Sequence, residues 1–259
     1  MTGGELQFLE VGRGAAARRI AMRIAPGGAP AVVWLGGFRS DMDATKATVL
    51  AAWAEGVGRA AVRFDYSGHG ASGGRFEEGT IGRWAEDAEA VVNAHGGEAP
   101  VLVGSSMGGW IALLVARARL AAGRPVGGLV LVAPAPDFTE ALMWRQEFTD
   151  DIRREIMETG FWMRHSDYAP EPYPITRALI EDGRDHLVLE APLRVGCPVT
   201  ILQGMEDPDV PWSHALTLVE HLAGDDVTLT LVKDGDHRLS RPEDLERLVK
   251  AVAGITAEP

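Results

Sequence analysis

Apolar runs of strand length alternate along this chain with longer segments of helical character, and this alternation limits the possible folds more than any other feature. The apolar runs are residues 6–11, 19–24, 31–35, 60–64, 101–103, 129–132, 199–202 and 227–232. The helical segments are residues 44–55, 80–94, 106–122, 212–222 and 242–253. A repeated strand–helix order predicts parallel strands with helices on both faces of one sheet.

The character of the runs supports a parallel sheet. From residue 31 onward most of them are continuously apolar rather than alternating. Strands buried on both faces show this pattern. No helical segment separates the first two runs, so we expect them to form an antiparallel edge. The predicted fold class is α/β, with a mostly parallel central sheet flanked by helices.

The segment 135–191 interrupts the alternation. It carries helical patches at 139–148 and 150–158. It also carries the aromatic residues Trp144, Phe148, Phe161, Trp162, Tyr168 and Tyr173 among others. A connection this long inside a compact domain usually has a function of its own. We therefore predict a core formed by residues 1–134 and 192–259, with residues 135–191 inserted as a small helical lid.

Composition narrows the classes of function. A length of 259 residues with 46% apolar residues suits one domain of this kind. The net charge of -12 disfavours nucleic acid and anionic lipid as partners. With Cys197 as the single cysteine, no internal disulfide and no Cys/His metal cluster is expected. We expect no cofactor, no metal and no membrane span. Because residues 1–5 lack the features of a leader, we expect a cytoplasmic protein. The sequence does not indicate an oligomeric state.

Two segments match the pattern G-x-S-x-G, and their context separates them. The match at 104–108 follows an apolar run and opens an apolar helical segment, whereas the match at 70–74 opens no helix. A nucleophilic serine needs a tight strand-to-helix turn that exposes Oγ, with glycines where side chains would clash. The helix also directs its free N–H groups toward the reacting centre. We predict Ser106 as the nucleophile rather than Ser72.

A serine hydroxyl needs a neighbouring base to act as a nucleophile near neutral pH. His237 follows the run 227–232, and active sites of parallel sheets collect at the carboxyl ends of strands. His69 lies in a glycine-rich loop after another run and is the alternative. The remaining histidines lie in helical or lid segments. We predict His237 as the base.

The base in turn needs a carboxylate that orients its ring and stabilises its charged form. Glu206, Asp207 and Asp209 follow the run 199–202, and Asp137 follows the run 129–132. In α/β-hydrolases the chain order is serine, acid, histidine. An acid near 207 fits this order between Ser106 and His237. Position alone does not decide which of these acids orients His237.

The oxyanion of an acyl-transfer reaction needs backbone N–H donors. The run 31–35 ends in Gly36-Gly37-Phe38, and two glycines allow the backbone to approach a ligand closely. Each such donor is worth on the order of 3 kcal/mol. We assign the donors to the N–H groups of Phe38 and Met107.

The chain resembles the α/β-hydrolase family, and within it the animal mitochondrial enzymes described as acyl-protein thioesterases and acyl-glucuronide esterases. The segments that carry the resemblance are residues 36–38, 40–42, 45–47, 63–68, 103–110, 204–207, 210–212 and 236–238. The resemblance implies that Ser106, Asp207 and His237 form the triad, which selects Asp207 among the acids. It also implies oxyanion donors at Phe38 and Met107, and cleavage of thioesters and activated esters. The lid matches less well than the core.

The predicted function is a serine hydrolase that cleaves carboxylic esters or thioesters of a small-molecule or acylated substrate through an acyl-enzyme. The aromatic side chains predicted to line the acyl pocket are Phe38, Trp144, Phe161, Trp162 and Trp212. Two alternatives keep the fold: a C–C bond hydrolase with the same triad, and a non-catalytic binding protein. A nucleotide-binding protein is a third, because residues 68–73 match G-x-G-x-x-G. That motif requires a helix that opens inside the glycines, and none is predicted there.

Overall fold

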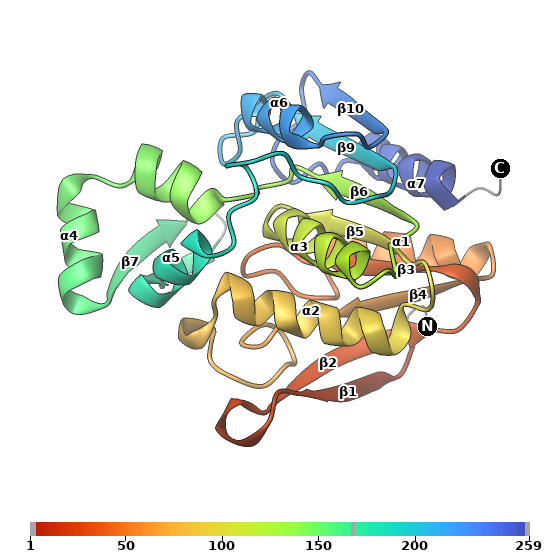
Figure 1. Cartoon of the computed structure of the whole chain (residues 1–259), viewed down its shortest axis with the longest axis horizontal. Coiled ribbons are helices and arrows are strands. Elements are labelled where there is room, and N and C mark those ends of the chain that lie inside the picture. The colour runs from red at the N-terminus through yellow and green to blue at the C-terminus, as the bar shows by residue number, and fades with distance from the viewer. Residues whose placement is uncertain (1–3, 167–168, 257–259) are drawn as a thin grey trace.

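The computed structural model describes residues 4–166 and 169–256, which form a central sheet with helices on both faces and a lid at one end (Figure 1). Tyr168, one of the lid aromatics, lies outside the described residues. The eight strands of the sheet lie in the order β1-β2-β4-β3-β5-β6-β9-β10. Their bounds are β1 Leu6–Val11, β2 Arg18–Ala25, β3 Gly28–Leu35, β4 Arg59–Phe64, β5 Val101–Ser105, β6 Gly128–Val132, β9 Val199–Gly204 and β10 Val227–Val232.

Strand pairing confirms the predicted fold class. From β4 across to β10 every neighbouring pair is parallel. β1 pairs antiparallel with β2, as expected for the edge, and β2 is also antiparallel to β4. All residues of β5 and β6 are buried, which explains their uninterrupted apolar sequences.

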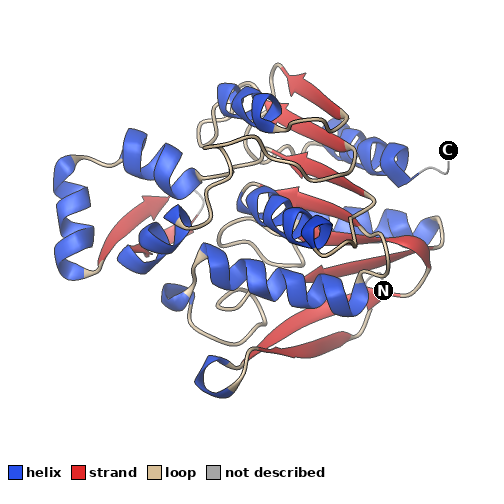
Figure 2. Cartoon of the chain, viewed as in Figure 1, coloured by secondary structure: helices blue, strands red, loops and turns tan. Residues whose placement is uncertain are grey.

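Helices cover the two faces of the sheet (Figure 2), and the buried apolar residues form two separate cores. On one face lie α2 (Ile81–His95), α3 (Met107–Ala121) and α6 (Trp212–His221), whose buried large apolar side chains belong to the larger core. On the other face lie α1 (Thr45–Gly56) and α7 (Pro242–Thr256), which pack over the smaller core. Because helices pack on both faces of the sheet, the strand ends that carry the candidate site are held in place.

The lid differs in part from the expectation. It contains the wide helical turn η3 (Thr139–Glu147), α4 (Asp150–Thr159) and α5 (Arg177–Arg184), and also a separate two-stranded antiparallel sheet of β7 (Phe161–Ser166) and β8 (Ala169–Thr176). Neither of these two strands was predicted from the sequence. Prolines recur at alternate positions of β8, and a strand with proline is tolerated where its N–H side has no partner. Both strands of a two-stranded sheet are edge strands, so each has one side without a paired strand.

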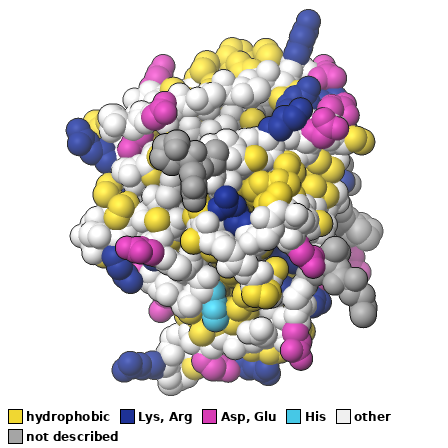
Figure 3. Space-filling view, turned by 90° about the vertical axis from the view of Figure 1, so that its right-hand side faces the viewer, with side chains coloured by type: hydrophobic (Ala, Val, Ile, Leu, Met, Phe, Trp, Pro, Cys, Tyr) yellow, Lys and Arg dark blue, Asp and Glu magenta, His cyan; other side chains and the backbone are white. Residues whose placement is uncertain are grey.

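The face at the end away from the lid carries charged side chains of both signs (Figure 3). In the view from the end away from the lid, acidic and basic side chains are interspersed among apolar and neutral ones (Figure 3). Within residues 4–166 and 169–256, no helix combines the length and apolar character that a bilayer span requires.

Candidate active site

Ser106 stands at the sharp turn between β5 and α3. Its backbone has φ 55° and ψ -118°, a conformation that side chains rarely adopt and that recurs where a nucleophile is held exposed. The glycines of the motif permit this turn. A Cβ at Gly104 would lie 2.3 Å from the carbonyl oxygen of Gly108, and a Cβ at Gly108 would lie 2.1 Å from that of Leu35. Both positions therefore require glycine.

Three predicted side chains meet in one hydrogen-bonded chain. His237 Nε2 lies 3.1 Å from Ser106 Oγ, and His237 Nδ1 lies 2.8 Å from Asp207 Oδ2. Since a carboxylate only accepts, the Asp207 contact places the proton on Nδ1 and leaves Nε2 to accept from the serine hydroxyl. The arrangement allows a proton to pass from Ser106 Oγ to His237.

Asp207 is buried and held by several donors. Its Oδ1 accepts the backbone N–H groups of Asp209 at 2.9 Å and Val210 at 2.8 Å, and its Oδ2 also accepts Gln203 Nε2 at 3.1 Å. Donors to both oxygens fix the orientation of the carboxylate. Asp207, Asp209 and His237 have possible metal-ligating atoms within 4.8 Å of one another. The hydrogen bonds to both Asp207 oxygens fit an acid–base pair better than a metal site.

The structure places the alternative acids and the second serine elsewhere. Asp137 accepts the backbone N–H groups of Val188 and Leu189 and so anchors the end of the lid, with its pKa raised by burial. Glu206 is exposed. Ser72 Oγ donates to Asp65 O at 2.7 Å and accepts Ala21 N–H at 2.8 Å, so this hydroxyl has a structural role.

The predicted oxyanion loop lies against the serine turn. A Cβ at Gly37 would lie 3.3 Å from Ser105 O and 3.5 Å from Ser106 Cβ. Met107 is the first residue of α3, so its N–H has no carbonyl partner within the helix. Phe38 N–H and Met107 N–H thus belong to the two segments that meet at the serine turn.

His69, the alternative base, belongs to the support of this loop. Its Nε2 accepts Arg39 N–H at 3.1 Å, and burial lowers its pKa to about 4. The glycine-rich loop around it does not cradle a phosphate. Asp65 fills the loop and accepts Ala71 N–H at 2.8 Å, and a Cβ at Gly70 would collide with its carboxylate.

Two cavities open at Ser106 and His237. The first has a volume of about 160 Å³ and lies under the lid. Its apolar wall is formed by Phe38, Met107, Ala135, Phe138, Leu142, Met143 and Val210. Its polar side contains the ion pair of Arg164 and Glu147, at 2.9 Å, with Tyr173 and Asp209. Burial raises the pKa of Glu147, an effect that Arg164 opposes.

The second cavity is larger and more polar. It has a volume of about 580 Å³ and is lined by Arg39, Lys46, Asp236, Arg238 and Arg241 among others. Burial lowers the pKa of Lys46 to about 8, with a further lowering by Arg238. Ser106 and His237 therefore border both a smaller, more apolar space and a larger, more polar one.

The predicted pocket aromatics need correction. Of the five, Phe38 lines both cavities, but Trp144, Phe161, Trp162 and Trp212 line neither of them in the described part of the chain. Trp144 and Trp162 pack against Phe148 inside the lid, with ring centroids 6.4 and 5.5 Å from its own. Phe161 is 45% exposed and Trp212 is 39% exposed.

The residues that take their place were not predicted. Phe138, Leu142 and Met143 come from the start of the lid, and Tyr173 comes from β8. The spacing of 138 and 142 is one helical turn, which indicates a shared face. That signal existed in the sequence, although it does not say what the face covers.

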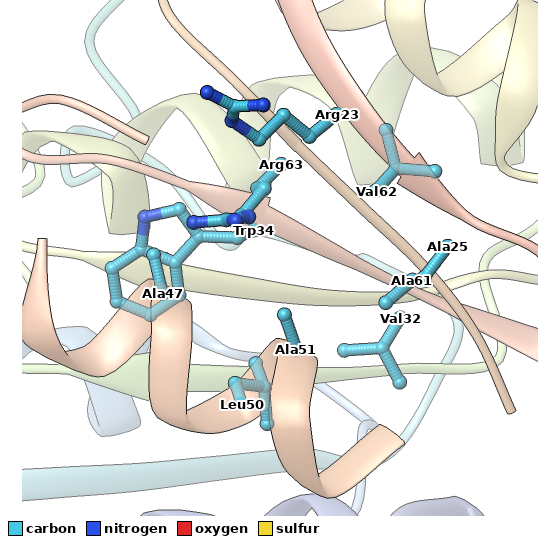
Figure 4. A pocket seen from close by; sticks show the side chains of 10 residues that line it. All are labelled: Arg23, Ala25, Val32, Trp34, Ala47, Leu50, Ala51, Ala61, Val62 and Arg63. Carbon is cyan, nitrogen blue, oxygen red and sulfur yellow. The ribbon is translucent and has the colours of Figure 1, made fainter. Parts of the chain in front are cut away.

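A further pocket lies away from the site, between α1 and the strands behind it (Figure 4). Its apolar part is formed by Val32, Trp34, Leu50 and several alanines, with Arg23 and Arg63 at its edge. Its volume of about 10 Å³ is roughly the room of one water molecule. We read it as a packing gap rather than a binding site.

Comparison with known proteins identifies the family of this chain. The sequence pattern of the alpha/beta hydrolase family matches residues 24–251, and the chain belongs to that family. Among its relatives is the human mitochondrial palmitoyl-protein thioesterase ABHD10, which is 33% identical over 234 residues. The match covers 90% of this chain and 75% of the human protein. The homologues therefore support an ester-hydrolysing enzyme.

Solved structures show the same fold. A putative hydrolase from Agrobacterium vitis is 50% identical, with a TM-score of 0.94 and coverage of 98% of this chain and 99% of the other. Alpha/beta hydrolase domain-containing protein 10 from mouse is 30% identical, with a TM-score of 0.86 and coverage of 97% and 98%.

Proposed function

We propose that this protein is a serine hydrolase that cleaves carboxylic esters or thioesters through an acyl-enzyme. The observation that carries the proposal is the hydrogen-bonded chain from Ser106 Oγ to His237, at 3.1 Å, and from His237 to Asp207, at 2.8 Å. Separate hydrogen bonds fix Asp207, and a strained turn exposes Ser106. A nucleophile, a base and an orienting acid in this geometry define acyl-transfer chemistry.

In the acylation step, Ser106 Oγ bonds to the carbonyl carbon while His237 Nε2 takes the hydroxyl proton. The carbonyl oxygen becomes an oxyanion and accepts the N–H groups of Phe38 and Met107. Asp207 stabilises the imidazolium that forms. The bond to the leaving oxygen or sulfur then breaks, and His237 returns its proton to that atom, which departs as an alcohol or thiol.

In the deacylation step, water attacks the acyl carbon of Ser106. His237 takes one proton of this water as the new C–O bond forms. The same two N–H groups stabilise the second oxyanion. The bond to Ser106 Oγ breaks, His237 returns the proton to Oγ, and the products are a carboxylic acid and free enzyme.

The two cavities suggest which part of a substrate each of them would hold. The apolar space under the lid suits the acyl group, and the polar cleft suits the leaving group. The acyl space of about 160 Å³ is close to that of an engineered cavity of roughly 150 Å³ that binds benzene. We therefore propose that the preferred acyl group, aliphatic or aromatic, has roughly six to eight carbons.

The relatives add the thioester to this proposal. The human relative is named as a palmitoyl-protein thioesterase. A sixteen-carbon chain exceeds the space under the lid, so this chain would hydrolyse a palmitoyl thioester only with the acyl chain extending past the cavity. We propose that the bond type is shared with the relative and that the acyl group is shorter.

The test is hydrolysis of p-nitrophenyl esters and matched acyl thioesters from two to sixteen carbons, by wild type and Ser106→Ala. Glu206→Gln is the matched control, because Glu206 directly precedes Asp207, is exposed and lines neither cavity among the described residues. We expect turnover by wild type and Glu206→Gln and none by Ser106→Ala. The optimum should lie near six to eight carbons, roughly as the cavity predicts.

Two other outcomes are informative. Equal activity of Ser106→Ala and wild type would show that another group performs the reaction. An inert wild type on the whole series would contradict the esterase proposal, and carbon–carbon bond hydrolysis by the same triad would then be examined. An optimum at sixteen carbons would keep the chemistry and overturn the proposed size.

A cytoplasmic location and independence from a cofactor remain predictions. Fractionation of source cells tests the first, and recovery of the protein with the membrane fraction would contradict it. Dialysis against a chelator tests the second, and a loss of activity that added metal restores would contradict it.

A further inference from the structure

The turn that carries Phe38 adopts a conformation that its sequence does not favour. Ser40 N–H donates to Gly37 O at 3.1 Å, which closes a turn over residues 37–40. Arg39 within it has φ 59°, in the left-handed region. For a residue other than glycine this conformation costs about 1–2 kcal/mol. Contacts from outside the turn must therefore stabilise it.

His69 provides such a contact. Its Nε2 lies 3.1 Å from Arg39 N. A backbone N–H can only donate, so Nε2 accepts and the ring proton is on Nδ1, which lies 3.2 Å from Ser67 O. The side chain is 4% exposed, and its lowered pKa keeps the ring neutral near pH 7. The Nε2 lone pair is thus available to Arg39.

The ring of His69 is itself held on several sides. It packs against Tyr66, Phe76 and Trp84, with centroid distances of 5.8, 5.4 and 5.2 Å. Trp84 Nε1 donates to the same Ser67 carbonyl at 3.0 Å. His69 cannot move aside without breaking these contacts.

The support continues into the core. Ser67 donates its N–H and its hydroxyl to Asp87, at 2.9 and 2.7 Å, and Asp87 accepts from Arg18 Nε at 2.5 Å. Asp87 and Arg18 are both buried. The chain of bonds therefore connects β2 and α2 to the backbone of the turn beside the serine.

We propose that His69 is a positioning residue that holds the Phe38–Arg39 peptide so that Phe38 N–H stays directed at the substrate carbonyl. Within the turn, Gly37 C=O faces Ser40 N–H. The two groups of a trans peptide point in opposite directions, so Phe38 N–H points out of the turn. Loss of the His69 acceptor lets Arg39 leave the left-handed region, and Phe38 rotates with it. The inference rests on the proposed function but concerns no proton transfer by His69.

The test compares two substitutions with opposite properties. His69→Gln retains an acceptor, because Oε1 reaches about where Nε2 lies, but loses the aromatic ring. His69→Phe retains the ring packing and loses the acceptor. His221→Phe is the control, since the His221 side chain hydrogen-bonds to Thr217 O within its own helix and lines neither cavity among the described residues.

Two readouts are measured on each variant: ester hydrolysis, and the rate at which a fluorophosphonate forms a bond to Ser106 Oγ with release of fluoride. Removal of one oxyanion donor lowers kcat about 100- to 1,000-fold. For a displaced donor we expect His69→Phe to lose about 10- to 100-fold in kcat with KM nearly unchanged. His69→Gln and His221→Phe should stay near wild type.

The melting temperatures decide between positioning and simple stability. If His69 were only a packing residue, activity would follow the melting temperature, and the Gln variant would be the weaker one. A folded His69→Phe with wild-type labelling and kcat would overturn the proposal, as would equal losses in both variants. A wild type that the fluorophosphonate does not label would instead contradict the proposed function, so the two failures are distinguishable.

Discussion

The core and the lid of this protein hold their functional residues in different ways. In the core, backbone and side-chain hydrogen bonds fix Asp207, and van der Waals limits at Gly104 and Gly108 shape the serine turn. In the lid, η3 and β8 supply the cavity wall, and Met157, Phe161 and Met163 expose much of their apolar surface. Hydrogen bonds and close contacts thus constrain the core part of the site, whereas the lid contributes side chains to the cavity wall. We therefore expect core changes to alter the rate on every substrate and lid changes to alter which substrate is preferred.

The largest effect is expected for the acid of the core. Asp207→Asn removes the charge that fixes the tautomer of His237, and an amide at this position in a triad lowers kcat about 10⁴-fold. Steady-state kinetics on a short and a long ester should show equal losses. A loss confined to one chain length would break the distinction between core and lid.

The buried His69 gives the core a dependence on pH. Its pKa falls from 6.5 in the unfolded chain to about 4 in the folded one. Between these values the unfolded state binds the proton more readily, so the free energy of unfolding decreases as pH falls from 6.5 to 4. The full effect is about 3 kcal/mol. Urea unfolding at pH 7.5 and 4.5 should show a smaller decrease for His69→Phe than for wild type. Equal decreases would show that His69 does not contribute.

An intermediate effect is expected in the lid wall. Leu142→Ala enlarges the apolar cavity, and one methylene in such a pocket is worth about 1–3 kcal/mol. The ratio of kcat/KM for decanoyl over hexanoyl esters should rise about tenfold, with kcat for the best ester nearly unchanged. A uniform fall on all esters would instead indicate that Leu142 supports the triad.

The smallest effect is expected for Trp212→Ala. Trp212 is 39% exposed at the start of α6 and lines neither cavity among the described residues. Its replacement should change kcat/KM less than about twofold and the free energy of unfolding by no more than about 1 kcal/mol. A shifted chain-length optimum would show that Trp212 does contribute to the acyl pocket.

Features set by residues close together in the chain could be predicted from the sequence, whereas features set by contacts between distant segments could not. The strand-to-helix turn at Ser106 and the strand end before His237 are local patterns, and both residues meet as expected. The β7–β8 pair was not predicted because proline is rarely found in a strand that is paired on both sides. The prolines of β8 are tolerated because its sheet has two strands, so one side of β8 has no paired strand. The pocket tryptophans were misplaced because an aromatic residue in a lid can face inward, outward or its own neighbours.

The sequence by itself determined the parallel sheet, the antiparallel edge and the serine turn, because burial on both faces and the glycines leave few other conformations. Only the tertiary structure decided which lid side chains face Ser106 and that His69 supports the neighbouring turn rather than acting as a base. These outcomes depend on distances between segments far apart in the chain, such as Arg39 and His69. Local propensity carries no information on such distances, because packing of the whole core sets them.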